Sequence, residues 1–263
     1  MFLYQCEDSL EGIFTAIYNI YEDKRNREEV MVCTDEENFL FAEAVMVQTD
    51  VDKAEKVIRT LRRQFGEEDY YSLCLALASE DERKAQAVYR TVAKGIRVKC
   101  RKGHLLDDLS DEWVHLAFAL GRAAGREYDH LRGFLRFEEL EQGILYAQIG
   151  PKNRILPFLM NHFADRFPKE NFMIYDEKRK ILGIHEAGDF NHSRRNSWYL
   201  VQCGEELTVK ISTERSETER AYQKLFHYFC QKIAIQERRN LNLQRNMLPL
   251  RYREYMTEFK QEN

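Results

Sequence analysis

The chain has 263 residues and a formal net charge of -4; 44% of its residues are hydrophobic and 32% are charged. This composition excludes a disordered or collagen-like chain, because there is enough apolar mass to bury a core. No apolar run approaches the roughly 20 residues that a membrane-spanning helix needs, which excludes an integral membrane protein.

The first residues and the cysteines favour a cytoplasmic protein. Residues 1–8 lack a basic segment, and acidic residues come before any long apolar stretch, which argues against a secretory signal. No two of the six cysteines form a Cys-x-x-Cys unit, which disfavours the common zinc and iron–sulfur frameworks. We therefore expect buried, reduced thiols, a cytoplasmic location, no bound cofactor and no membrane partner.

Charge is unevenly distributed along the chain. Residues 1–82 carry 20 acidic and 8 basic side chains, a net charge of -12, whereas residues 83–263 carry 24 and 32, a net charge of +8. Residues 83–104 contain eight Lys or Arg and no acidic residue. This basic segment can attract phosphate backbones, or it can be a solvated helix face or pair with the acidic first third. Both interpretations stay open at this point.

The first half is predicted to be mostly helical after a short strand at residues 2–6. Apolar residues recur at helical spacing, with Asp8 as the N-cap of the first helix and Thr49 or Asp50 as the N-cap of the second. The predicted helices cover residues 8–21, 50–65, 67–79, 82–94 and 112–124.

The pattern changes near His130, where alternating residues and turn signals predict strands. Strands are predicted from Phe134 towards Gly143 and over residues 144–149, 172–175, 181–184 and 198–203. Helices are predicted over residues 153–167, from a capping box at Ser216 and Glu219 onward, and from Pro249 through Tyr255. The apolar residues of the long helix after Ser216 are expected to form its buried face; they are Tyr222, Leu225, Phe226, Phe229 and Ile233.

The order of these elements predicts an α+β fold. A helical domain over residues 1–129 is expected to pack on an α+β domain over residues 130–263, with an antiparallel sheet and helices on one face. No Pro- or Gly-rich linker separates the two halves.

Few motifs point to a particular chemistry. Phosphate-binding loops, nucleophile elbows and the His-Glu-x-x-His zinc motif are absent, and Gly121-x-x-x-Gly125 is interpreted as a close-packing position on a helix. His185, Asp189 and His192 have the side chains of metal ligands, but they lie on a loop after a strand, so we predict no metal site there.

Two polar clusters suit nucleic acid. His162 and Arg166 are four residues apart on a predicted helix, so they share a face, and the arginine would disfavour protonation of the histidine. Residues 236–246 contain three Arg, three Asn and two Gln, which match phosphates and base edges. The alternatives are a helix-end His with a surface Arg, and a C-terminal cap whose amides satisfy loop backbone.

Several strings of this sequence resemble one bacterial family. They are GFLRF at 133–137, IGP at 149–151, HFADRF at 162–167, IYD at 174–176, ERRN at 237–240 with Gln244, Pro249 and RY at 251–252, and the opening residues 4–18. The family comprises DNA metabolism proteins linked to a radical-SAM protein of DNA modification and repair, and its domain also occurs fused to a uracil-DNA-glycosylase-like domain. The resemblance implies work on DNA, but it brings no assigned catalytic residue. The radical-SAM cysteine motif is absent, so this chain would be the companion protein.

We therefore expect a protein of DNA metabolism. It would bind DNA, including single-stranded DNA, or present DNA to a radical-SAM partner enzyme. The expected nucleic-acid-binding residues are Arg136, His162, Arg166, Arg238, Arg239, Asn240 and Gln244. One alternative is a base-acting hydrolase that uses His162 with Asp165 or Asp176. Another is a protein-interaction adaptor whose acidic first third binds a basic partner.

Overall fold

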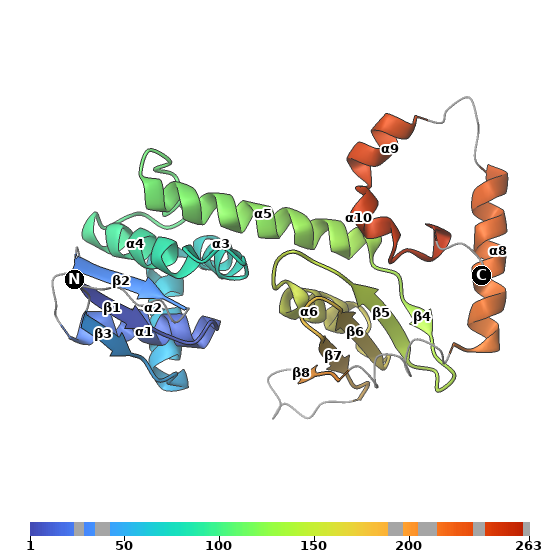
Figure 1. Cartoon of the computed structure of the whole chain (residues 1–263), viewed down its shortest axis with the longest axis horizontal. Coiled ribbons are helices and arrows are strands. Elements are labelled where there is room, and N and C mark those ends of the chain that lie inside the picture. The colour runs from blue at the N-terminus through green and yellow to red at the C-terminus, as the bar shows by residue number, and fades with distance from the viewer. Residues whose placement is uncertain (24–28, 35–42, 189–196, 205–214, 234–239, 260–263) are drawn as a thin grey trace. The chain divides into compact units, whose positions relative to one another are not determined.

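The computed structural model describes residues 1–23, 29–34, 43–188, 197–204, 215–233 and 240–259 (Figure 1). The chain forms two compact units. Unit 1 comprises Met1–Arg126 with Lys152–Arg154, and unit 2 comprises Glu127–Pro151 with Ile155–Asn263. The chain passes from unit 1 to unit 2 within helix α5, Glu112–Phe134.

Unit 1 contains a small parallel sheet that the sequence predicted only in part. Strand β1 (Phe2–Gln5) lies between β2 (Val30–Cys33) and β3 (Glu43–Met46), and it pairs with both in parallel. Helix α1 (Leu10–Glu22) connects β1 to β2. A helical crossover returns the chain in its starting direction, which explains the parallel pairing. The predicted strand at residues 2–6 is confirmed, whereas β2 and β3 were not predicted.

The predicted helices of the first half are confirmed. They are α2 (Val51–Phe65), α3 (Glu67–Leu77), α4 (Lys84–Arg97) and α5. Of the two predicted caps, Asp50 and not Thr49 caps α2, because its carboxylate accepts a hydrogen bond from the Lys53 N–H at 3.1 Å. The cap predicted for α1 was wrong by one residue, since Ser9 Oγ accepts the Gly12 N–H at 3.0 Å.

Asp8 has a different role from the predicted helix cap. Its carboxylate lies 2.7 Å from Lys84 Nζ and 2.7 Å from an Arg154 guanidinium nitrogen. The Lys84 side chain is only 2% exposed and also donates to the Ser79 carbonyl at 2.7 Å. Asp8 therefore neutralises a buried lysine, a task that requires contacts distant in sequence.

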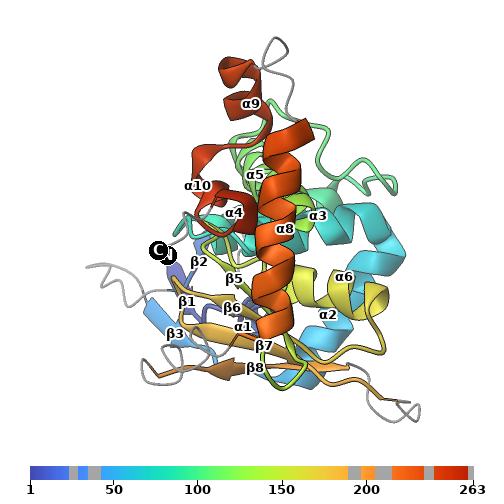
Figure 2. The ribbon, with the colours of Figure 1, turned by 90° about the vertical axis from the view of Figure 1, so that its right-hand side faces the viewer.

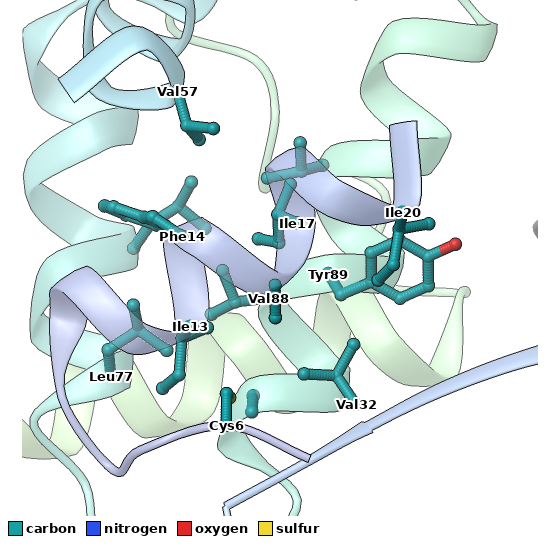
Figure 3. Close-up of a cluster of buried hydrophobic side chains, with 14 of the residues drawn as sticks. Cys6, Ile13, Phe14, Ile17, Ile20, Val32, Val57, Leu77, Val88 and Tyr89 are labelled. Carbon is teal, nitrogen blue, oxygen red and sulfur yellow. The ribbon is translucent and has the colours of Figure 1, made fainter. Parts of the chain in front are cut away.

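The core of unit 1 joins its sheet to helices α1 to α4. Tyr4, Phe14, Phe65 and Tyr89 are fully buried and belong to one hydrophobic cluster. Figure 3 shows side chains of this cluster from α1, α2 and α4 gathered around Ile17. Burial of each of these large side chains adds about 2–3 kcal/mol to the free energy of unfolding of the unit.

Unit 2 contains a five-stranded sheet in the order β4-β5-β6-β7-β8. The strands are β4 (Glu138–Glu139), β5 (Leu145–Ile149), β6 (Phe172–Asp176), β7 (Ile181–His185) and β8 (Trp198–Gln202). The prediction of a wholly antiparallel sheet was wrong, because β5 and β6 pair in parallel. The other neighbours are antiparallel, so the sheet is mixed. The α+β class itself is confirmed.

Helix α6 (Leu156–Arg166) explains the parallel pair. It lies in the connection between β5 and β6, which is therefore a crossover and not a hairpin. The helix packs on the sheet through Met160, whose side chain lies directly over Gly183 of β7. A Cβ atom at Gly183 would come within 2.5 Å of Met160 Sδ, so the glycine permits this close approach.

The end of α5 differs from its prediction. The helix continues to Phe134, where the sequence predicted the start of a strand, and β4 comprises only two residues. Tyr252 explains part of this difference, because its buried ring contacts His130 and Phe134 of α5 with centroid distances of 5.6 Å. Tertiary contacts thus extend the helix beyond its local pattern.

The C-terminal part of unit 2 is helical. It comprises α8 (Glu217–Ile233), α9 (Leu241–Met247), α10 (Leu250–Arg253) and a 3₁₀ turn, η3 (Thr257–Phe259). The predicted cap is confirmed, since Ser216 Oγ accepts the Glu219 N–H at 3.0 Å. The predicted buried face of α8 was wrong: Tyr222, Leu225, Phe226 and Phe229 are all exposed, and the side chain of Ile233 lies outside the described part of the chain.

The described thiols agree with the expectation of reduced cysteines. Cys6, Cys33, Cys74 and Cys203 are buried, Cys100 is half-buried, and none of these five forms a disulfide. Burial raises the pKa of the Cys6 thiol to about 12, which makes it a poor nucleophile. Within the described ranges, none of the helices combines the length and the apolar character that crossing a membrane requires.

Candidate nucleic-acid interface

Helix α6 presents His162 and Arg166 at the surface of unit 2. Its buried residues recur at helical spacing and anchor the helix; they are Leu156, Leu159, Met160, Phe163 and Ala164. This leaves His162 half-buried and Arg166 exposed on the outer side. The two side chains lie one helical turn apart, as predicted.

The environment of His162 lowers its pKa below the ordinary value of 6.5. Partial burial is the main cause, and the guanidinium groups of Arg132 and Arg166 add to it, whereas Asp165 opposes them. The predicted effect of Arg166 on the histidine is thus confirmed. At neutral pH the imidazole is uncharged, so it can donate one hydrogen bond and accept another.

Helix α5 supplies two further side chains to this position. The Tyr128 ring meets the His162 ring edge-on with a centroid distance of 6.5 Å. The Arg132 guanidinium lies over the Tyr128 ring at 5.4 Å from its centroid. The Asp129 carboxylate is 3.4 Å from Arg132, but both side chains are largely exposed, so this ion pair is weak.

A second aromatic ring is bound to α6. Trp198, the first residue of β8, donates its indole N–H to the Asn161 side-chain oxygen at 2.9 Å. Both residues keep exposed surface. The bond fixes the edge of the indole, so the ring face has a defined orientation beside α6.

We call Tyr128, Arg132, Asn161, His162, Arg166 and Trp198 the α5–α6 patch. It combines two fixed positive charges with two aromatic rings and one neutral imidazole. Guanidinium groups bind phosphate oxygens, and aromatic rings stack on unpaired bases. The patch therefore has the side chains that a single-stranded nucleic acid requires.

Arg136 lies apart from this patch. Its guanidinium pairs with the Glu258 carboxylate at 2.9 Å and donates to the Gly133 carbonyl at 2.9 Å. The Glu258 side chain is mostly buried in this pair. These bonds connect the segment after α5 to η3, so Arg136 holds these two segments together.

The two carboxylates predicted beside His162 lie in different places. Asp165 is exposed on α6 and acts on the His162 ring electrostatically. Asp176 is buried at the carboxyl end of β6, where Arg179 lies 2.8 Å away and the Lys178 N–H donates to it at 3.1 Å. Burial raises the pKa of Asp176, and Arg179 opposes that rise.

The crossover geometry separates Asp176 from His162. His162 lies in the second half of α6, and the chain leaving α6 enters β6 at Phe172, the opposite end of the strand from Asp176. The Asn161–Trp198 hydrogen bond places this part of α6 at the same end of the sheet as Phe172. Trp198 pairs with His185 across β7 and β8, and His185 pairs with Phe172 across β6 and β7. The structure thus brings together His162, Arg166 and Asp165, and leaves out Asp176.

The C-terminal candidates are only partly described. Asn240 caps α9, because its side-chain oxygen accepts the Leu243 N–H at 2.9 Å. Gln244 is exposed on the same helix. Arg238 and Arg239 lie outside the described residues. Asn240 is thus the N-cap of α9 and not the C-terminal cap that the alternative interpretation expected.

The histidine loop after β7 is described as far as residue 188. His185 is buried, its Nδ1 lies 2.9 Å from the Glu170 carbonyl oxygen, and its ring stacks on Phe172. Asp189 and His192 lie outside the described residues. The remaining described side chains include no group of three or more potential metal ligands.

The basic segment 83–104 is partly neutralised within unit 1. Lys84 pairs with Asp8, Arg83 with Asp81, and Lys94 with Asp108 and Asp111. Pairing with the acidic first third, one of the open interpretations, thus accounts for Lys84 and Arg83. Lys99, Arg101 and Lys102 remain exposed after α4.

Sequence reasoning missed Tyr128, Arg132 and the role of Asn161. One signal was available, because Tyr128 and Arg132 are four residues apart and share a face of any helix that includes them. The predicted helix ended at residue 124, so this pair was not recognised. The contact between Tyr128 and His162 joins two elements and has no local signature.

Comparison with protein families shows a match to one family model over residues 82–258, which is more than half of the chain. Curated proteins and solved structures yielded no match. The matched region includes helices α4 to α6, the whole sheet of unit 2 and the C-terminal helices. The chain belongs to the family defined by the domain of unknown function DUF4130.

Proposed function

We propose that this protein binds single-stranded DNA through the α5–α6 patch and acts in DNA metabolism. The resemblance of its sequence strings to DNA metabolism proteins suggests the process. The patch suggests the mode of binding, because its charges and rings suit phosphates and unpaired bases.

One observation carries the proposal. Arg132 and Arg166 come from two different helices, yet both act on the His162 ring. Two cations thus lie near a neutral, half-buried imidazole beside Tyr128, which is an arrangement that suits a phosphate and an adjoining base. In the proposed complex the arginines neutralise phosphates, a base stacks on Tyr128, and His162 makes a directional hydrogen bond.

The proposal is tested by fluorescence anisotropy with a labelled single-stranded oligonucleotide. The double substitution Arg132→Ala/Arg166→Ala removes two charge-assisted contacts and should weaken binding by about 100-fold at low salt. Arg122→Ala is the matched control, because it removes an exposed arginine from the same helix outside the patch. Equal binding by the wild type and the double variant would refute the assignment of the patch.

Stacking has a separate test. Tyr128→Ala should weaken binding by about 1–3 kcal/mol, whereas Tyr128→Phe keeps the ring and should bind nearly as well as the wild type. A competition with duplex DNA of the same length then measures the preference for single strands. If the duplex binds as tightly as the single strand, stacking on unpaired bases is not the mode of recognition.

Delivery of DNA to a radical-SAM enzyme is the finer form of this proposal. It rests on the resemblance to the linked family and on the lack of a radical-SAM cysteine motif in this chain. Co-purification of the two proteins, with and without oligonucleotide, tests it. A stable ternary complex is expected, and failure to associate under both conditions would contradict it.

A hydrolase that acts on bases is the second candidate. The lowered pKa of His162, with Asp165 near its ring, keeps the imidazole neutral and able to accept a proton. In this version Asp165 is the partner carboxylate, because Asp176 is held by Arg179 at the far end of β6. Turnover of lesion-bearing oligonucleotides that His162→Ala abolishes would support it, and no turnover on a broad panel would count against it.

A further inference from the structure

Helix α8 exposes its apolar side and turns its polar side towards the rest of unit 2. Tyr222, Leu225, Phe226 and Phe229 are 64%, 62%, 41% and 53% exposed. Their spacing of three, one and three residues places them on one stripe of the helix. Figure 2 shows α8 facing the viewer along its whole length. We call these four residues the α8 stripe.

The polar side of α8 is attached to strand β4. The Glu219 carboxylate accepts the Glu139 N–H at 3.2 Å, and the Ser216 N–H donates to the Glu139 carbonyl at 3.1 Å. Gln223 donates to Glu219 at 2.7 Å, and Arg215 pairs with Glu138. The bonds of Ser216 and Glu219 with Glu139 hold the first turn of α8 against β4, and turning the stripe inward would break the Glu219 bond.

A contiguous apolar stripe of this size is unfavourable in water and marks an interaction site. We propose that the α8 stripe pairs with the α8 stripe of a second copy of this chain. Apolar residues spaced by three and four positions, as in Tyr222, Leu225 and Phe229, form the pattern by which the side chains of two paired helices interlock. This interface is independent of the α5–α6 patch and goes beyond the proposed DNA binding.

The area of the stripe is sufficient for a self-complementary pair. Side chains of this size each have about 200 Å² of surface, and about half of it is exposed here, which leaves roughly 450 Å² per copy. Two copies would bury roughly 900 Å², and the exposed neighbours Thr218 and Ala221 bring the total to about 1,000 Å². That is the lower range for a specific interface.

Helix dipoles favour an antiparallel pair, because two antiparallel dipoles attract each other. With the two-fold axis between Leu225 and Phe226, Tyr222 lies opposite Phe229 of the second copy and Leu225 lies opposite Phe226.

Sedimentation velocity of the full chain over a concentration series tests the pairing. The wild type should be dimeric, and Leu225→Glu should weaken dimerisation by at least about 100-fold, because two carboxylates would enter the apolar interface. Lys224→Glu adds a carboxylate at the next residue, off the stripe, and should leave the dimer intact. Circular dichroism confirms folding, which these exposed positions do not threaten.

Cysteine cross-linking tests the orientation. Leu225→Cys lies beside the proposed axis and should form a disulfide dimer on oxidation, whereas Thr218→Cys lies far from its copy and should not. The wild type supplies the background from the native cysteines. A monomeric wild type at every concentration would overturn the proposal and leave the stripe to another partner. A dimer unaffected by Leu225→Glu, or efficient cross-linking through Thr218→Cys, would also overturn it.

Discussion

At the scale of single residues, electrostatic neighbours from other elements decide the state of the side chains of interest. His162 is kept neutral by burial and by arginines from both α5 and α6. Asp8 was expected to cap a helix, yet it neutralises the buried Lys84. In both cases residues from other elements determine the outcome: the charge state of His162 and the ion-pair partner of Asp8.

The lowered pKa of His162 predicts a pH dependence of stability. The unfolded chain protonates this imidazole near pH 6.5, whereas the folded chain does so only at lower pH, so the unfolded state binds more protons between the two values. The free energy of unfolding should therefore fall as the pH drops from 7 to 5. Urea denaturation should show a smaller fall in His162→Gln than in the wild type.

A histidine NMR titration gives a direct measurement of this effect. The His162 resonance should titrate below pH 6.5, and Arg132→Ala should move its pKa upward because one of the opposing charges is lost. An unchanged titration in Arg132→Ala would mean that this guanidinium does not act on the ring.

The buried Lys84 predicts a large cost when its partner is removed. In Asp8→Ala the ammonium group loses its carboxylate while it stays enclosed, and the free energy of unfolding should decrease by about 3 kcal/mol. Asp81→Ala is the control, because it breaks the exposed pair with Arg83 and should cost less than about 1 kcal/mol. Chemical denaturation of the three proteins measures both values, and equal losses would contradict the argument.

At the scale of elements, close packing and crossovers decide what each helix and strand can do. The Gly121-x-x-x-Gly125 motif was interpreted as a close-packing position, and the structure confirms this for Gly121, where a Cβ would come within 2.7 Å of the Ser72 backbone carbonyl. A Cβ at Gly125 would make only an ordinary contact of 3.4 Å with Leu75. The two glycines on one helix thus have different roles.

This difference predicts opposite effects of the same substitution. Gly121→Ala should destabilise unit 1 by about 1–3 kcal/mol, because α3 and α5 must move apart to accept the methyl group. Gly125→Ala should be neutral or stabilising by up to about 1 kcal/mol, since alanine is the better helix former. Thermal unfolding of the two variants measures both effects, and similar melting temperatures would show that the packing at Gly121 is not tight.

At the scale of the whole molecule, a near-neutral total hides two halves of opposite charge. Residues 1–82 carry a net charge of -12 and the remainder carries +8. Part of the positive charge is consumed by pairs within unit 1, such as Lys84 with Asp8. Binding of a polyanion would therefore depend on a local group of cations and not on the net charge of the protein.

The proposed binding of DNA should therefore depend on salt concentration. Each neutralised phosphate of a single strand contributes about -0.7 to the slope of log K against log salt concentration. Arg132 and Arg166 should thus make the wild-type slope steeper by about 1.4 than that of Arg132→Ala/Arg166→Ala. Anisotropy titrations at several salt concentrations measure the two slopes. Identical slopes would mean that these arginines do not contact phosphates.

Much of the fold follows from local patterns in the sequence. Apolar spacing predicted α1 to α4 and α6, turn residues predicted β6 and β7, and Ser216 marked the start of α8. These signals are local because a helix or strand must present one apolar side to the core. Apolar residues therefore recur with the period of that element over a short stretch of sequence. The α+β class followed from the order of the elements.

The arrangement of the site could not be derived in this way. His162 and Arg166 were recognisable because they lie on one helix, whereas Tyr128 and Arg132 join them only after α5 and α6 have packed together. Arg136 was predicted to bind nucleic acid like Arg166. Its guanidinium is instead paired with the carboxylate of Glu258, which lies 122 residues further along the chain. Similar side chains acquire different roles because their partners come from distant segments.

The sequence by itself therefore determined most helices, most strands, the caps Asp50 and Ser216 and the uneven charge of this protein, since each depends on neighbouring residues. The tertiary structure decided the parallel pairing of β5 with β6, the grouping of the α5–α6 patch and the outward direction of the α8 stripe. These features depend on which distant segments meet, and that is set by the packing of the whole unit and not by any local pattern.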